Sequence, residues 1–238
     1  NGESGGKKRK VSSSDIFVED FSAGVDYLGT LSYVDREQIG AIGICGSGGF
    51  LLGAAAIDSR IKVVIPVVLY DIPALNHNEE NWNEMVYNLS LARWTDVNNG
   101  KQECIDLYRS DRVYYDSLPV FPEGEEFEKH WKPFYTTERG HHPRSTGGFT
   151  TTSQFSLANL NVTANINKIH PRHILFITSK DSHSYNYTKE VYDRLINKSY
   201  VELEEDTIGN HTDFYDNLNV IPFDKIVKFL EENLKPNS

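Results

Sequence analysis

Apolar segments with the pattern of buried strands alternate with helical patterns along most of the chain. Four segments are predicted strands: 39–45, 61–70, 173–179 and 200–208. Four segments with apolar residues at helical spacing are predicted helices: 14–32, 49–57, 187–197 and 223–234. Almost wholly apolar strands are typical of a sheet that helices cover on both faces. The order of elements therefore predicts an α/β fold with a mainly parallel sheet.

The segment 71–165 interrupts this alternation. Residues 78–94 have a helical pattern, whereas 116–135 and 139–156 are irregular and rich in aromatic residues. A connection of this length is uncommon inside a compact domain, so we interpret it as an inserted cap or lid. The predicted division of the chain is 1–70 (core), 71–165 (cap) and 166–238 (core).

The first predicted strand ends in a corner of small residues, 43–47 (GICGS), that leads directly into a helix. Gly-x-nucleophile-x-small at a strand–turn–helix corner is the nucleophile elbow of α/β hydrolases. The strained nucleophile needs small neighbours, and the helix N-terminus directs amides toward a developing oxyanion. This frame places Cys45 at the apex and the Gly46 amide in the oxyanion hole. A frame two residues later would make Ser47 the nucleophile, but its apex would lie beyond the apolar run, so we favour Cys45.

A glycine-rich crossover turn is the competing interpretation of this corner. No Lys-Ser/Thr pair follows it, which excludes a P-loop, and the Gly-x-Gly-x-x-Gly order of a dinucleotide site is absent. A turn without any chemistry stays open.

A candidate base and two candidate acids follow later strands. His211 lies after the last predicted strand, where an α/β hydrolase carries its general base. Asp181 follows the strand at 173–179, where the acid that orients the imidazole is expected. Asp71, directly after the strand at 61–70, is the substitute position. We favour Asp181 and leave Asp71 open.

Composition narrows the classes of partner. The 238 residues carry a formal net charge of −10, which argues against nucleic acid as a partner. No apolar run reaches the roughly 18 residues of a membrane span, so no membrane partner is expected. The two cysteines, Cys45 and Cys104, do not suggest a disulfide framework, which favours a cytoplasmic location. No cofactor or metal is expected, because His141, His142 and His183 lack ligand partners at suitable spacing.

Four segments, taken together, resemble a known group of α/β hydrolases: 18–50, 139–161, 180–195 and 209–234. The group comprises dienelactone-hydrolase-like proteins of the YcjY type, and fungal polyketide transferases and thiohydrolases are similar to it. The resemblance implies an α/β-hydrolase fold, an elbow at Cys45 and a catalytic His211. The family varies at Asp181, so the third member of the triad does not transfer.

The start of the chain, NGESGG, resembles a loop that follows the fourth strand in such proteins. The resemblance implies that the first strands and half of the oxyanion hole precede this loop. We therefore expect an exposed sheet edge and low activity unless another chain supplies the missing part. A homodimer is left open.

These features predict acyl transfer through a nucleophile–His–acid triad, with an ester, lactone or thioester as the small-molecule acyl substrate. Aromatic residues of the cap suggest a bulky apolar acyl group; they are Trp82, Trp94, Tyr114, Tyr115, Trp131, Phe134 and Tyr135. One alternative is an acyl or polyketide transferase, or a thiohydrolase, that acts on a carrier-bound substrate. Another is a catalytically silent α/β-hydrolase fold used for binding.

Overall fold

A computed structural model describes residues 4–6, 10–72, 82–106, 127–135, 137–140, 142 and 148–234. The chain forms two compact units. The sheet unit comprises Asp15–Ile72 and Asn161–Ser238, and the insert unit comprises Asn1–Ser14 and Pro73–Leu160. The assignment of 71–165 as a lid stays a prediction.

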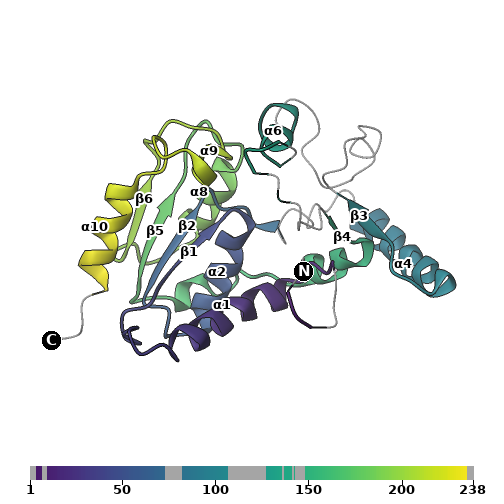
Figure 1. The fold of residues 1–238 in the computed structure, drawn as a ribbon, viewed down its shortest axis with the longest axis horizontal. Helices are drawn as coiled ribbons and strands as arrows, with labels where there is room; N and C mark the ends of the chain where they lie inside the picture. The colour runs from purple at the N-terminus through teal and green to yellow at the C-terminus, as the bar shows by residue number, and fades with distance from the viewer. Residues whose placement is uncertain are drawn as a thin grey trace. The chain divides into compact units, whose positions relative to one another are not determined.

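The sheet unit is built on four parallel strands (Figure 1). In spatial order they are β1 (Gly40–Ile44), β2 (Val63–Val67), β5 (His173–Ile177) and β6 (Val201–Glu204). Every residue of β2 is buried, which explains its continuously apolar sequence. Because all four strands run in the same direction, their carboxyl ends meet at one edge of the sheet. The predicted parallel sheet is confirmed.

Helices cover both faces of this sheet. They are α1 (Ser14–Leu28), α2 (Gly46–Ile57), η3 (Ile166–Lys168), α8 (Tyr185–Asp193), α9 (Asp213–Asp216) and α10 (Phe223–Asn233). Alternate residues of β5 point to opposite faces. Phe176 packs in a core with α1, α2 and α8, whereas Leu175 packs in a second core with α9 and α10. None of the helices in the described part of the chain combines the length and the hydropathy that crossing a membrane requires.

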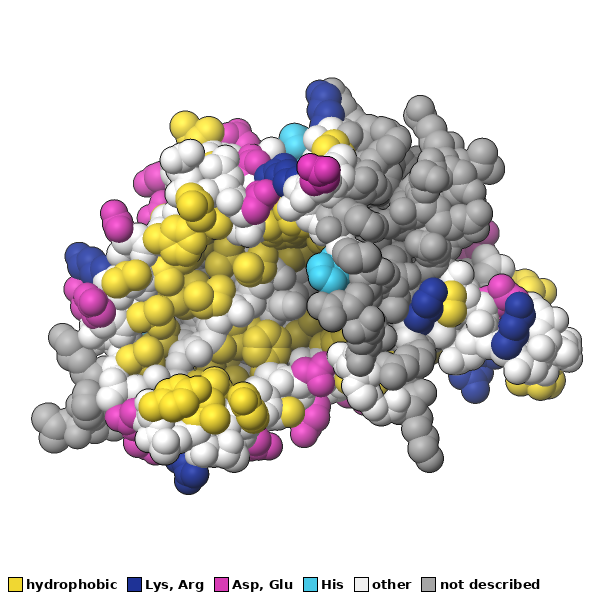
Figure 2. Space-filling view, in the orientation of Figure 1, with side chains coloured by type: hydrophobic (Ala, Val, Ile, Leu, Met, Phe, Trp, Pro, Cys, Tyr) yellow, Lys and Arg dark blue, Asp and Glu magenta, His cyan; other side chains and the backbone are white. Residues whose placement is uncertain are grey.

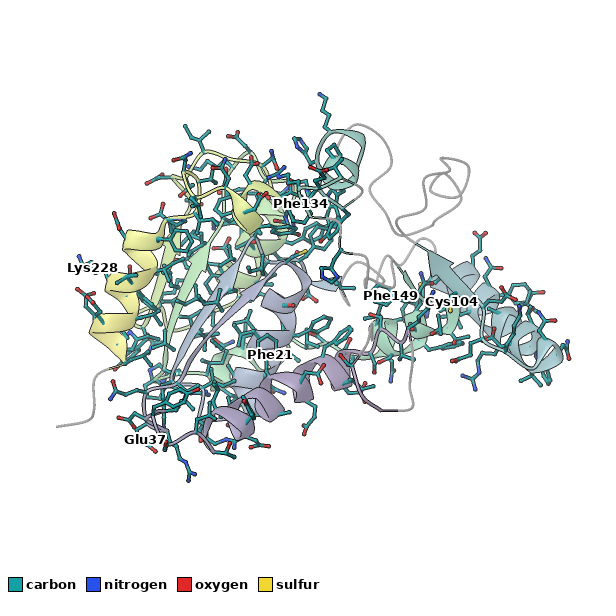
Figure 3. The ribbon with its side chains drawn as sticks, in the orientation of Figure 1. Phe21, Glu37, Cys104, Phe134, Phe149 and Lys228 are labelled. Atoms are coloured by element: carbon teal, nitrogen blue, oxygen red, sulfur yellow. The ribbon has the colours of Figure 1, made fainter. Side chains whose placement is uncertain are left out.

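The insert unit contains one long helix, α4 (Trp82–Asn99), which agrees with the helical pattern at 78–94. It also contains short elements that the sequence does not reveal: β3 (Cys104–Asp106), the π-helix η1 (Phe127–Trp131), α6 (Lys132–Tyr135), β4 (Gly148–Thr150), η2 (Thr151–Ser153) and α7 (Gln154–Asn159). Strand β4 pairs with β3 in antiparallel fashion; Figure 3 labels Phe149 and Cys104 on this pair. The prediction of irregular structure was wrong for 127–135 and 148–156. A three-residue strand is too short to show a period, and its partner lies more than 40 positions away in the sequence.

One edge of the sheet carries exposed apolar side chains. Strand β1 pairs with β2, and no other strand among the described residues pairs with it. Ile42 and Ile44 are 45% and 40% exposed. Figure 2 shows hydrophobic side chains gathered on the side of the sheet unit that faces the viewer. Tyr27 of α1 and Phe223 of α10 are exposed as well. Such an edge favours association with other apolar surfaces.

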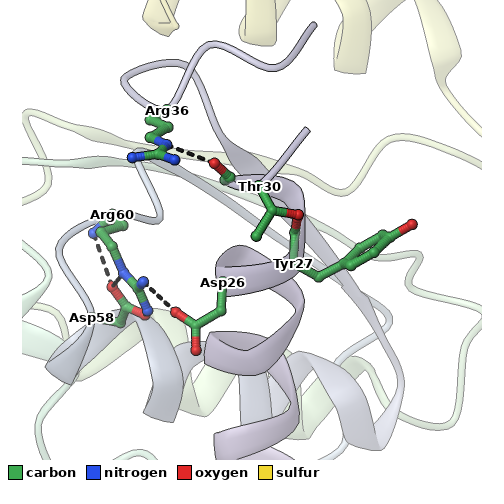
Figure 4. A network of polar contacts seen from close by, with 7 residues as sticks. Asp26, Tyr27, Thr30, Arg36, Asp58 and Arg60 are labelled. Carbon is green, nitrogen blue, oxygen red and sulfur yellow. Dashed lines mark hydrogen bonds and ion pairs between the residues drawn. The ribbon is translucent and has the colours of Figure 1, made fainter. Parts of the chain in front are cut away.

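Charged side chains tie α1 to the C-terminal end of α2. Arg60 donates to the carboxylate of Asp58, directly after α2, with Nη2–Oδ2 at 2.7 Å. It also pairs with Asp26 on α1 (Figure 4). Hydrogen bonding by Arg60 lowers the pKa of the Asp58 carboxyl. These contacts hold the helix end that lies opposite Cys45.

The carbonyls at the same helix end are capped by Arg172, in the turn before β5. Its guanidinium donates to the carbonyl of Ala55, and at 2.9 Å to those of Asp58 and Ile61. The last carbonyls of a helix have no partner within the helix. Arg172 thus anchors α2 to the start of β5.

Replacing this cap is expected to destabilise the sheet unit. Arg172→Met removes three donors while keeping most of the apolar stem, and the expected loss is about 3 kcal/mol of unfolding free energy. Arg172→Lys, which keeps the charge but not the fork of donors, is expected to lose less. Urea unfolding followed by circular dichroism measures both variants. Equal stability of wild type and Arg172→Met would contradict this account.

Candidate active site

Cys45 occupies a sharp corner between a strand and a helix. Strand β1 ends at Ile44, α2 begins at Gly46, and Cys45 between them has φ 86° and ψ −118°. Such a left-handed conformation costs a residue other than glycine about 1–3 kcal/mol. Main-chain bonds maintain it: the Cys45 N–H donates to Val67 O at 3.0 Å, and the Tyr70 N–H donates to Cys45 O at 2.9 Å.

The neighbours of Cys45 are small because the strand and the helix approach closely. A Cβ on Gly43 would overlap the main-chain carbonyl of Ser47, and a Cβ on Gly46 would overlap the side chain of Ile72. Ser47 is exposed within the first turn of α2. The strained corner is therefore at Cys45, and Ser47 has helical surroundings.

An aromatic cluster forms where the ends of β2, β5 and β6 meet. The ring centroid of His211 lies 4.4 Å from that of His183, 5.4 Å from that of Tyr215 and 6.0 Å from that of Tyr70. Tyr215 follows His211 by four residues, in α9, and its hydroxyl acts to lower the pKa of the Cys45 thiol. Tyr215 therefore lies next to the candidate base and influences the candidate nucleophile.

Neither Cys45 nor His211 favours its charged form in this cluster. Burial raises the pKa of the Cys45 thiol above 9.0, and hydrogen bonds from Tyr215 and from the Gly46 amide oppose this increase. Burial, and then the charge of His183, lower the pKa of His211 well below 6.5. At neutral pH the site therefore holds a thiol and a neutral imidazole.

Among the hydrogen bonds and ion pairs of the described residues, none joins a candidate acid to His211. Asp181 is exposed, and within the described residues its carboxylate makes no hydrogen bond or ion pair. Asp71 is buried, accepts a hydrogen bond from Thr163 at 2.9 Å and lies 3.9 Å from Arg194. The Nδ1 atom of His211 instead lies 2.9 Å from the hydroxyl of Ser184.

Sequence reasoning missed the side chains that surround the two central residues. Ser184 follows β5, where an acid was sought, but a serine in a polar loop gives no distinctive signal. Tyr215 lies four positions after His211, a spacing that indicates contact once a helical turn is assumed. Among the described residues, no group of three or more His, Cys, Asp or Glu is placed to hold a metal ion.

The aromatic residues of the predicted cap do not define a substrate pocket among the described residues. Trp94 is 68% exposed, whereas Trp131 is buried and lies 6.1 Å from the ring of Tyr135. Tyr114 and Tyr115 lie outside the described residues. The bulky apolar acyl group stays a prediction.

Two curated relatives are similar to most of the chain. PA2218 of Pseudomonas aeruginosa, an uncharacterised protein, is 36% identical over 247 aligned positions, which span 98% of this chain and 62% of the relative. YcjY of Escherichia coli K12, also uncharacterised, is 30% identical, and the match spans 90% of this chain and 70% of YcjY. No protein-family model matches the chain.

Solved structures show the same fold. The crystal structure of PA2218 matches with a TM-score of 0.86 and 35% identity, over 98% of this chain and 72% of that one. DcsB, in complex with a substrate analogue, matches with a TM-score of 0.79 and 17% identity. The match spans 98% of this chain and 77% of the DcsB chain. The α/β hydrolase GrgF from Penicillium sp. sh18 matches with a TM-score of 0.73 and 16% identity. The match spans 98% of this chain and 76% of the GrgF chain. The sheet unit therefore has an α/β-hydrolase fold, as predicted.

The raised pKa of the Cys45 thiol can be tested by measuring its rate of alkylation. Because burial raises the pKa of the Cys45 thiol, its alkylation by iodoacetamide is expected to accelerate about tenfold per pH unit from pH 7 to 9. Tyr215→Phe removes the hydroxyl that lowers this pKa, so the rate at a given pH is expected to fall by about threefold to tenfold. Peptide mass spectrometry measures the rate, and the exposed Cys104 is the internal control. A plateau below pH 8 would indicate a preformed thiolate and contradict the assignment.

Proposed function

Because this chain belongs to the α/β-hydrolase-fold family that includes YcjY and PA2218, we propose that it catalyses acyl transfer from an ester, lactone or thioester, with Cys45 as nucleophile. The observation that carries this proposal is the strained corner at Cys45, directly before the N-terminus of α2. A buried imidazole in the same cluster supplies a base.

The acylation step follows from these groups. His211 Nε2 accepts the proton of the Cys45 thiol while sulfur attacks the carbonyl carbon, and the carbonyl π bond becomes an oxyanion. The Gly46 N–H, at the start of α2, donates to that oxyanion. The tetrahedral intermediate then collapses, the bond to the leaving alcohol or thiol breaks, and His211 returns the proton to the leaving group.

Hydrolysis of the thioester intermediate restores the enzyme. Water attacks the acyl carbon, His211 accepts its proton, and Cys45 departs and is reprotonated. A thiol leaves more readily than an amine, so esters and thioesters are favoured over amides. An acceptor alcohol in place of water would make the enzyme an acyl transferase by the same steps.

A catalytically silent fold is the second candidate, and the electrostatics of the site support it. Cys45 and His211 both favour their uncharged forms, so no reactive thiolate is present before substrate binds. In that case the cluster would serve for binding, and Cys45 would not be acylated.

Acylation of the protein by an activated ester separates the two functions. We expect p-nitrophenyl acetate and an acetyl thioester to give an acetyl adduct on wild type and on Ser47→Ala, visible by intact-mass spectrometry, and none on Cys45→Ala. The serine variant is the matched control, because Ser47 lies two residues away on exposed helix surface.

Each other outcome assigns a different function. An adduct lost only in Ser47→Ala would make the protein a serine enzyme. Modification by the thioester alone would favour a thiohydrolase or a transferase that uses a carrier-bound substrate. No adduct with either ester, from a protein whose Cys45 is still alkylated by iodoacetamide, would contradict the proposal and support the silent fold.

A further inference from the structure

The loop after β5 presents two serine hydroxyls to the imidazole of His211. Ser184 Oγ lies 2.9 Å from Nδ1 and Ser182 Oγ lies 3.4 Å from it. The two hydroxyls are 3.0 Å apart. All three side chains are at least 97% buried, so water does not compete freely for these contacts.

This is the place that a carboxylate occupies in a Ser-His-Asp triad, where it holds the imidazole in one tautomer and orientation. The two aspartates near the strand ends are engaged differently. Asp181 is exposed and makes no contact with His211 among the described residues. Asp71 accepts from Thr163 and lies near Arg194.

We propose that Ser184, supported by Ser182, is the residue that positions His211 for proton transfer in place of a carboxylate. This inference rests on the proposed acyl transfer and names a positioning residue for it. Ser184 acts only through the imidazole, and a hydroxyl replaces the acid of the familiar triad.

The geometry of this loop indicates which atoms donate and which accept hydrogen bonds. The Ser184 N–H donates to Ser182 Oγ at 3.3 Å. In the arrangement that leaves His211 Nε2 as a base, the Ser184 hydroxyl also donates a hydrogen bond to Ser182 Oγ. Ser184 Oγ then accepts a hydrogen bond from the protonated Nδ1 of His211. The remaining nitrogen, Nε2, then carries the lone pair that accepts the thiol proton.

A hydroxyl can suffice here because the nucleophile is a thiol. A carboxylate stabilises the imidazolium that forms during attack, which a serine nucleophile requires because its hydroxyl is a very weak acid. Among the described residues, the titratable side chains whose rings lie near that of His211 are His183, Tyr70 and Tyr215, and none of these residue types is anionic at neutral pH.

The tautomer of His211 can be measured without any assay of activity. Long-range ¹H–¹⁵N correlation NMR of histidine-labelled protein at pH 7.5 is expected to show the Nδ1–H tautomer, with the signal assigned by its loss in His211→Gln. In Ser184→Ala the ring is expected to change to a mixture that contains the Nε2–H tautomer. A wild-type ring protonated on Nε2 would overturn the inference.

The rate of acylation provides the second arm. Ser184→Ala is expected to slow acylation of Cys45 by p-nitrophenyl acetate about 10- to 100-fold. Its alkylation by iodoacetamide above the thiol pKa should be unchanged, because a thiolate needs no base. Ser179→Ala is the matched control: Ser179 is a buried serine of the same loop that accepts from the Asp181 N–H, and twofold loss at most is expected.

The remaining variants decide between hydroxyl and acid. Asp181→Asn or Asp71→Asn causing a larger loss than Ser184→Ala would overturn the inference and restore a carboxylate triad. Equal losses in Ser179→Ala and Ser184→Ala would assign the effect to the loop shape. If wild type is not acylated at all, the proposed function fails, and the NMR result still decides whether Ser184 positions the ring.

Discussion

The close approach of β1 and α2 at Cys45 is the constraint on which the candidate site depends. The chain turns there within one residue, because glycine at 43 and 46 leaves no side chain between strand and helix. The turn places Cys45 directly before the first residue of α2. Arg172 fastens the opposite end of the same helix to the start of β5. The position of Cys45 is thus set by its place between β1 and α2.

The parallel sheet supplies the rest of the site. Because the strands end at one edge, loops far apart in sequence bring Tyr70, Ser184 and His211 into one cluster. Burial of this cluster favours uncharged groups, and its polar contacts come from hydroxyls. Within the described part of the chain the cluster contains no ion pair, so the proposed acyl transfer would depend on a proton moving when substrate arrives. Under that proposal the site would suit activated acyl groups, whose carbonyl carbon needs a less powerful nucleophile.

The sequence predicted the sheet and the corner well, because both rest on local patterns. Continuous apolar runs at 61–70 and 173–179 became β2 and β5, and the small residues around Cys45 marked the turn. Asp181 was favoured as the acid from its position after a strand. Whether a side chain in a loop turns inward depends on main-chain bonds such as that from Ser184 N–H to Ser182, which sequence spacing does not encode. The pairing of β3 with β4 was missed for a related reason, since it joins distant short segments.

The conformation of Cys45 also has a consequence for how this position varies. A φ of 86° strains every residue with a side chain, and glycine would relieve that strain. Folding stability and chemistry therefore favour different residues at the same place. A library of variants sorted for stability alone would become enriched in glycine at position 45, whereas one sorted for acyl transfer would retain cysteine. Under the proposed function, the strain at this corner is the cost in stability of placing the sulfur at the apex of the turn.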